Sequence, residues 1–224
     1  MSSYGQFCSV ARALDLLGGR WTLLVVREVL CGSTRFTEIR RGIPRVSRTI
    51  LSERLQALVA AGVLDRTEGP HGPEYALTDA GRELAGVVGA LGTWGQRRLP
   101  RDPIPDDLDL EPLLLDMRRR VRFAALPPEP VVVRFDLDSR KPRYLLLRPT
   151  EASLCDHNPG YPERVRIGGP IAALVAWWRG DATFPAARRR GLVIDGDAAS
   201  VRSFPDFFDR YLFADVAPAQ EHAS

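Results

Sequence analysis

Apolar residues in the first part of the chain recur every three or four positions. This is the period of an α-helix with one buried face, and it predicts helices over residues 8–17, 21–30, 36–41 and 47–61. In the second of these helices we expect Val25 and Val29 to be buried, and Arg27 and Glu28 to reach solvent. The pattern therefore predicts a small helical domain up to Gly62.

A glycine–proline break separates the third predicted helix from the fourth. Gly42 and Pro44 interrupt the pattern, and Ser47 is a residue type that caps helix N-termini well. One face of the fourth helix is apolar and contains Leu51, Leu55, Leu58 and Val59. The opposite face carries hydrogen-bonding side chains: Arg48, Thr49, Ser52 and Gln56. This arrangement predicts a helix-turn-helix whose second helix contacts bases in the major groove.

Arginines are dense around this stretch. Guanidinium groups bind phosphate through two parallel hydrogen bonds, so these arginines are expected to contact the DNA backbone. The candidates are Arg35, Arg40, Arg41, Arg45 and Arg54. The alternative interpretation is a plain helical hairpin with a solvated charged face, because short helix-turn-helix patterns also occur by chance.

After Gly62 the pattern changes to that of short strands. Residues 63–67 and 75–77 read as two strands, joined by the turn-forming sequence Gly69–Pro73. A hairpin directly after a recognition helix is typical of a wing. Arg66 and His71 are therefore candidates for phosphate or minor-groove contacts, although a lone loop histidine is more often simply solvated.

A long amphipathic helix follows the hairpin. Thr78 is its expected N-cap, and the helix is predicted to run to about Leu99. Its apolar stripe consists of Leu84, Val87, Val88, Leu91 and Trp94. A small winged-helix domain has little core left to receive this stripe. We therefore expect a homodimer formed by this helix and the helix over residues 8–17, which also suits two-fold DNA half-sites.

The second half of the chain reads as a sheet with covering helices. Residues 100–112 are rich in proline and aspartate and are expected to form a linker. A helix over 113–122 precedes strands expected at 131–137, 144–148, 151–157, 164–167 and 192–197. Apolar helices are expected over 170–179, 185–190 and 198–208.

Charge and cysteine content narrow the class of protein. Residues 1–100 carry 13 arginines and nine carboxylates, whereas residues 101–224 carry 18 basic and 19 acidic residues. The positive excess therefore lies with the predicted helix-turn-helix. Three cysteines without zinc spacing, and a start that does not resemble a signal peptide, favour a cytoplasmic protein.

Catalytic, cofactor and metal patterns are not evident in the sequence. It contains no glycine-rich phosphate loop, nucleophile elbow or zinc-protease motif. In Cys155–Asp156–His157 only Cys155 and His157 would share a strand face, which is too few ligands for zinc. We therefore expect a protein that is not an enzyme and has no metal or cofactor.

Residues 8–99 resemble the HxlR-type winged helix-turn-helix transcriptional regulators. The resemblance is carried by CSVARALDLLGGRWTLLVVREVL, RFTEIRRGIPRVSRTILSERLQALVAAGVLDR and YALTDAGREL. It implies a DNA-binding dimer, and it makes Cys8 a candidate thiol sensor of oxidants. The alternative for Cys8 is a small buried residue at a helix start. This chain departs from the family by continuing for more than a hundred residues after the last helix.

The second half resembles the sterol-carrier-protein fold, in which helices cover a sheet over an apolar cavity. The resemblance is carried by RVRIGGPIAALVAWWRGDATFPAARRRGLVIDGDAASVRSFPDFF and implies binding of a lipophilic small molecule. The expected lining is Leu174, Trp177, Trp178, Val133, Phe135 and Leu146. A dry, filled core is the alternative, because a sequence cannot show a void.

The predicted fold class is α+β. We expect a winged helix-turn-helix domain over residues 1–99, a linker over 100–112, a sterol-carrier-like domain over 113–216 and a flexible tail over 217–224. The predicted function is a dimeric, sequence-specific DNA-binding regulator, most simply a repressor, controlled by an apolar ligand. The alternatives are a lipid-binding or transfer protein whose first domain only dimerises, and a hydrolase or acyl-handling enzyme that uses the C-terminal cavity.

Overall fold

The computed structural model describes residues 3–101, 108–138 and 140–219. Part of the predicted linker and the end of the predicted tail lie outside these residues. The chain divides into two compact units, Met1–Thr93 and Trp94–Ser224. The boundary falls within a single helix, α5, which runs from Asp79 to Arg98.

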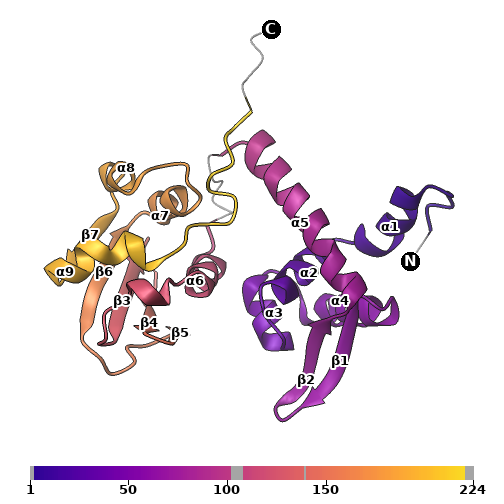
Figure 1. Cartoon of the computed structure of the whole chain (residues 1–224), viewed down its shortest axis with the longest axis horizontal. Coiled ribbons are helices and arrows are strands. Elements are labelled where there is room, and N and C mark those ends of the chain that lie inside the picture. Colours follow the sequence, from indigo (N-terminus) through magenta and orange to yellow (C-terminus); the bar gives the residue numbers. More distant parts are fainter. Residues whose placement is uncertain (1–2, 102–107, 139, 220–224) are drawn as a thin grey trace, which may run out of the picture. The chain divides into compact units, whose positions relative to one another are not determined.

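The first unit is a winged helix-turn-helix. Figure 1 shows a two-stranded hairpin projecting from a small group of helices. In chain order its elements are α1 (Ser9–Leu17), α2 (Thr22–Leu30), α3 (Phe36–Gly42), α4 (Arg48–Ala60), β1 (Leu64–Gly69), β2 (Gly72–Leu77) and most of α5. The predicted helix-turn-helix and wing are thus confirmed as local structure.

Apolar faces of α2, α3 and α4 meet in one core. Leu51, Leu55 and Leu58 are fully buried there, as the helical spacing predicted. Leu84 and Val88 of α5 pack against this core, but Val87 and Leu91 remain exposed. Helix α1 buries none of its residues.

The hairpin is longer than the sequence predicted. Glu68 and Gly69 still pair with β2, so only Pro70 and His71 form the turn. Gly72, which follows the turn, has φ +106°, a conformation that favours glycine. At the base of the hairpin the Tyr75 N–H donates to the Thr34 carbonyl at 2.7 Å, so the residues before α3 extend the ladder.

The second unit is built on a five-stranded mixed sheet with the order β5-β4-β3-β6-β7. Among the neighbouring pairs of this described sheet, only β3 and β6 are parallel. The strands are β3 (Val131–Leu137), β4 (Arg143–Arg148), β5 (Glu151–Cys155), β6 (Glu163–Gly169) and β7 (Val193–Gly196). The helices are α6 (Leu110–Arg119), α7 (Ile171–Trp178), α8 (Phe184–Arg189), α9 (Ala198–Ser203) and the 3-10 helices η2 (Phe123–Ala125) and η3 (Phe204–Phe207).

The bounds of two predicted helices in this unit were wrong, and the first of them ends at Arg119 rather than at 122. Helix α6 begins at Leu110 rather than 113, because Asp109 accepts a hydrogen bond from the Glu111 N–H and caps the helix inside the predicted linker. The last predicted helix ends as an α-helix at Ser203 and continues only as the 3-10 turn η3, whose first turn contains a proline.

The core of this unit lies between one face of the sheet and the helices. Alternate residues of β3, including Val133 and Phe135, join Leu174, Trp177 and Trp178 of α7 there. The other sheet face carries a smaller cluster of Val132, Tyr144 and Leu146. The alternation of strand side chains explains this division.

The connection from β5 to β6 crosses that second face. Because β5 and β6 run in the same direction on either side of β3 and β4, residues 156–162 must return along the sheet. Tyr161 in this segment accepts a hydrogen bond from Arg148 Nη2 at 3.2 Å, and the guanidinium lies over its ring. This crossover between two parallel strands is therefore a segment of seven residues, whereas most such crossovers contain a helix.

The last turn of α5 belongs to the second unit. Gln96 is buried and exchanges two hydrogen bonds with Arg179 at the end of α7, each 3.2 Å long. Arg101 donates to Asp181 at 2.8 Å and to the Val216 carbonyl at 2.6 Å. These contacts fix the helix end, the α7 C-terminus and the C-terminal segment together.

A helix that spans a bilayer must be both long and apolar. Within the described residues, no helix meets both requirements.

Candidate nucleic-acid interface

Helix α4 presents a polar face from a rigidly held position. The Ser47 hydroxyl accepts a hydrogen bond from the Ile50 N–H at 3.2 Å, which confirms the predicted N-cap. Arg48, Thr49 and Gln56 are exposed and Ser52 is half-buried. In the part of the chain that the structure describes, none of these four side chains makes a hydrogen bond, so all four are available to a partner.

The arginines near this helix differ in how strongly they are engaged. Arg45 is exposed, whereas Arg35, Arg40 and Arg41 are half-buried. Arg35 makes only a long contact, 3.4 Å, to Glu74 on β2. So long a contact of Arg35 can be exchanged for one to a phosphate at low cost.

Arg54 is placed differently from the other arginines. Its Nε donates to the Arg20 carbonyl at 3.3 Å, and its guanidinium packs against Gly19 in the loop between α1 and α2. The side chain therefore ties α4 to that loop in the structure.

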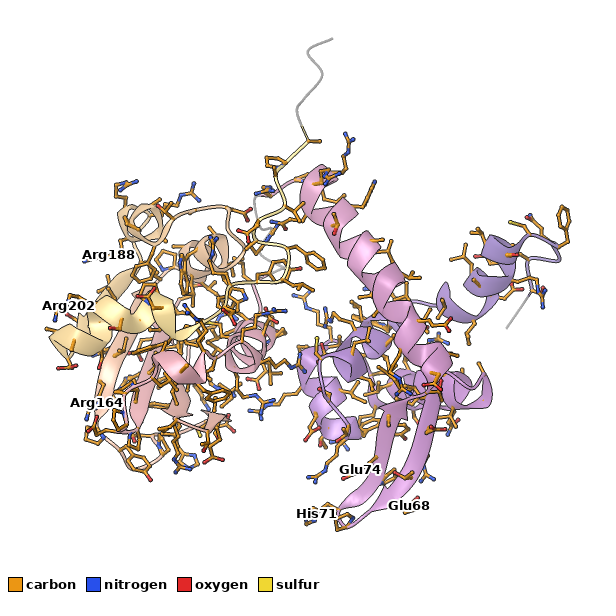
Figure 2. The ribbon with its side chains drawn as sticks, in the orientation of Figure 1. Glu68, His71, Glu74, Arg164, Arg188 and Arg202 are labelled. Carbon is orange, nitrogen blue, oxygen red and sulfur yellow. The ribbon has the colours of Figure 1, made fainter. Side chains whose placement is uncertain are left out.

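The wing carries more negative than positive charge. Arg66 is paired with Glu68 at 2.6 Å, and Asp65 and Glu74 add two further carboxylates. Figure 2 shows Glu68, His71 and Glu74 near the far end of the hairpin. His71 is exposed in the two-residue turn. Any approach of the wing to phosphate must therefore overcome nearby carboxylates, a feature that the expectation for Arg66 and His71 did not include.

A buried carboxylate lies beneath the turn of the helix-turn-helix. The expectation that Glu28 reaches solvent was wrong, because its exposed fraction is 1%. Its Oε1 accepts from Arg27 Nε at 3.0 Å and Nη2 at 2.6 Å, and the same Nη2 donates to the Gly42 carbonyl at 3.2 Å.

Gly42 is required by this arrangement. A Cβ at residue 42 would lie 1.9 Å from Glu28 Oε2. The pair Arg27–Glu28 therefore joins α2 to the end of α3, at the turn that sets where α4 begins. The sequence contains one hint of this buried carboxylate: a glycine, Gly42, at the end of a predicted helix.

Cys8 occupies the N-cap position of the exposed first helix. The backbone N–H groups of Ala11, first, and of Val10 lower the pKa of its thiol, and the side chain is exposed. The thiolate is thus favoured at the helix N-terminus. The alternative of a small buried residue was wrong.

The residues expected to line an apolar pocket lie in two places. Leu174, Trp177, Trp178, Val133 and Phe135 share the main core of the second unit. Leu146 belongs to the cluster on the opposite sheet face, because it alternates with Leu145 and Leu147 along β4. The structure therefore does not bring Leu146 together with the other five.

Aromatic rings fill much of the space around Trp177. Its ring centroid lies 5.1 Å from that of Phe184, 5.7 Å from Phe204 and 5.9 Å from Trp178. These are ordinary packing distances for aromatic pairs. Two surface pockets of this unit are lined by other residues.

Metal-ligating side chains do not gather in the described part of the chain. Within it, no group of three or more histidine, cysteine, aspartate or glutamate side chains is arranged to hold a metal ion.

The fold and the exposed face of α4 define the first unit as a winged helix-turn-helix of the DNA-binding type. The HxlR-like helix-turn-helix family model matches residues 16–103. YvaP, an HTH-type transcriptional regulator of Bacillus subtilis, is 43% identical over 86 residues, which cover 37% of this chain and 80% of YvaP. The chain belongs to the HxlR-like helix-turn-helix family.

Other relatives extend this similarity. An HTH-type transcriptional regulator of Mycobacterium tuberculosis is 46% identical over 102 residues, which is 43% of this chain and 63% of the relative. The chain thus spans less than two thirds of that relative's length. The solved structure of the reduced transcriptional regulator YodB from Bacillus subtilis is 32% identical and covers 40% of this chain and 93% of YodB, with a TM-score of 0.36. These relatives are transcriptional regulators, a class that is not enzymatic.

Proposed function

We propose that the chain is a sequence-specific DNA-binding transcriptional regulator and that α4 reads the major groove. The observation that carries the proposal is the exposed polar face of α4, with Arg48, Thr49 and Gln56 uncommitted and Ser52 at its edge. Arginine pairs with guanine, and glutamine with adenine, in that groove. A family of transcriptional regulators that includes this chain supports the same assignment.

The backbone contacts in this proposal come from the surrounding cations. Arg35, Arg40, Arg41 and Arg45 hold phosphates beside α4. Arg54 can bind phosphate only if it gives up its hydrogen bond to the Arg20 carbonyl, and Arg66 only if it gives up its ion pair with Glu68. His71 is the wing-tip contact.

A gel-shift assay with the DNA fragment upstream of the chain's own gene tests this function. We expect a discrete complex that survives excess non-specific duplex. If the chain retards specific and non-specific fragments equally, or neither, the assignment of α4 as a reading helix fails.

We further propose that two copies associate through α1 and α5. Val10 and Leu14 on α1, and Val87 and Leu91 on α5, are exposed apolar side chains. A second copy would cover them, and a two-fold dimer matches two half-sites. Sedimentation at micromolar concentration should give a dimer, and Leu91→Glu should give a monomer with weaker DNA binding.

The second unit is proposed to be a sterol-carrier-like effector domain for a small apolar molecule. A mixed sheet with helices on one face and an aromatic cluster beside α7 supports this. Because the rings around Trp177 are already in contact, the ligand must displace at least one of them. A ligand that prefers one conformation releases a repressor from its operator, typically with coupling of about 1–3 kcal/mol.

Tryptophan fluorescence tests the effector proposal. Titration with a medium-chain fatty acid should quench the emission and change operator affinity over the same concentration range. Quenching without any change in affinity would instead favour the alternative function, a lipid-binding protein whose first unit only dimerises. Cys8 is proposed as a second input, through oxidation of its exposed thiol.

A further inference from the structure

The arginines of the second unit fall into two groups. Many are paired with carboxylates, such as Arg134 with Asp136, Arg143 with Glu111 and Arg179 with Asp181. Others have no ion pair within the described ranges, and five of these form a second group: Arg164, Arg188, Arg189, Arg190 and Arg202. Arg97, Arg98 and Arg140 also have none, but they lie elsewhere in the unit. Figure 2 shows three of the second group, Arg164, Arg188 and Arg202, along the same margin of the unit.

This second group surrounds strand β7, which ends the sheet. Arg164 begins the pairing of β6 with β7, Arg188 to Arg190 come just before β7, and Arg202 lies on α9 just after it. Hydrogen bonds from Ser200 lower the pKa of the Asp197 carboxyl at the end of β7, and the charges of Arg164 and Arg202 add to this effect. The five arginines thus lie on the segments just before, beside and just after β7.

On the side of β7 that faces away from β6, backbone N–H and carbonyl groups have no strand partner in the described sheet. The Asp197 N–H donates to the Arg164 carbonyl at 2.9 Å, which fixes which residues face β6. By the alternation of an antiparallel ladder, Val193 and Asp195 direct their backbone groups to β6, and Ile194 and Gly196 direct theirs to the open edge. No further strand pairs with that edge in the described sheet.

A pocket lies where this edge meets α8. Its volume is about 420 Å³, and it is lined by Pro185, Arg188, Arg189, Leu192, Val193 and Ile194. The Val193 side chain is 54% exposed there. The pocket therefore combines apolar walls with two guanidinium groups.

We propose that this β7 edge binds an extended acidic segment of a partner protein. The segment adds to the sheet as a further strand, its carboxylates meet the five arginines around β7, and one apolar side chain enters the pocket. The arginines oppose pairing of two copies through the same edge, because like charges would face each other. A strand edge and apolar walls suit a polypeptide better than a nucleic-acid backbone.

A binding assay on the full chain tests the proposal. The probe is a fluorescent peptide of about six residues, the usual strand length, in which glutamate alternates with valine. We expect saturable binding that weakens with salt and that is lost when lysine replaces glutamate in the peptide. N-methylation of alternate peptide N–H groups should also abolish binding, and the bound peptide should slow amide hydrogen exchange at Ile194 and Gly196.

Variants locate the site. Arg188→Ala combined with Arg189→Ala should weaken peptide binding about tenfold or more, since two charge-assisted contacts are lost. Val193→Asp, at an exposed side chain, should weaken it by repulsion without disturbing the core. Arg140→Ala, an exposed arginine at another turn of the sheet, is the matched control and should have no effect.

Two results overturn the proposal. The first is equal binding of the glutamate and lysine peptides, or binding that is insensitive to the Arg188 and Arg189 substitutions. The second is a pair of observations: the unaltered chain binds no peptide, and the variant with Arg188→Ala and Arg189→Ala loses binding to non-specific duplex. Together these would identify the surface as a nucleic-acid contact. Peptide binding and the operator gel shift are separate measurements. Failure of the β7 proposal can therefore be distinguished from failure of the DNA-binding proposal.

Discussion

Helix α1 of the first unit buries none of its residues, whereas α7 of the second unit buries every residue except Ala172. The first unit also leaves Val87 and Leu91 of α5 exposed, on a helix otherwise anchored to its core. In the second unit, phenylalanine rings pack against Trp177 and Trp178. The first unit thus leaves apolar helix faces uncovered, whereas the second buries the apolar residues of α7 in its own core.

The largest expected effect is on the aromatic core of the second unit. Phe204 is fully buried and its ring contacts Trp177, Phe184 and Phe208. Phe204→Ala should lower the free energy of unfolding by about 3–5 kcal/mol, measured by denaturant titration of tryptophan fluorescence. Phe123→Ala, at a ring that is 40% exposed, is the control. Similar losses in both would show that this core is loosely packed.

The buried carboxylate of the first unit gives the next prediction. Gly42→Ala places a methyl group against Glu28 and should cost about 1–3 kcal/mol of unfolding free energy. Gly86→Ala, in α5 with no atom within 4 Å of the new Cβ, should instead stabilise by about 0.5–1 kcal/mol. Adding Glu28→Ala to Gly42→Ala should show strong coupling in a double-mutant cycle. Additive losses would mean that the two residues act independently.

Arg48 and Arg45 separate base reading from phosphate binding. Arg48→Ala should weaken operator binding by about 1–3 kcal/mol and leave non-specific binding unchanged. Arg45→Ala should weaken binding to all sequences and reduce the slope of log affinity against log salt by about one. Unchanged operator preference in Arg48→Ala would move the reading surface away from α4.

A substitution in the wing is expected to raise the affinity for operator DNA. Glu68→Gln removes a carboxylate near the end of the hairpin and releases Arg66 from its ion pair. If the wing approaches phosphate, operator affinity should rise by about twofold to tenfold at low salt, as expected for one altered charge. Thr67→Ala, one residue away, serves as the control. No change in Glu68→Gln would place the wing tip away from the DNA.

The smallest effect concerns thiol reactivity. Because the Ala11 and Val10 N–H groups lower the pKa of Cys8, its thiolate persists to lower pH than that of an ordinary cysteine. Iodoacetamide should therefore label Cys8 before the half-buried Cys31 and Cys155 at neutral pH, and its rate should reach half-maximum at a lower pH. Peptide mass mapping measures both. Equal labelling of all three would remove the basis for a Cys8 switch.

The sequence was most informative where one chemical rule decides local structure. Helical spacing predicted the buried leucines of α4, and residue type predicted the caps at Ser47 and Thr78. Strand β3 was predicted with its observed bounds, because its residues are mostly β-branched or apolar and turn residues follow it. Such features depend on a few neighbouring residues.

Tertiary packing decided the features that the sequence did not predict. Glu28 sits one residue from a buried valine, but only the approach of Gly42 makes room for its carboxylate. Leu146 is as apolar as Leu145, and the sheet alone assigns them to opposite faces. The open edge at β7 required the strand order, which places non-consecutive strands β3 and β6 side by side.

The crossover over residues 156–162 also has a kinetic consequence. Strands β3, β4 and β5 pair as successive neighbours, whereas β3 can pair with β6 only after the intervening chain has been made and returned along the sheet. Such non-local pairing is slow compared with hairpin formation. The described strand pairing of the first unit, which ends at Thr93, consists of the β1–β2 hairpin and the bridge between Arg35 and Glu74, so it needs no residue beyond Leu77. During synthesis the first unit can therefore fold before the partner strand of β3 has been made.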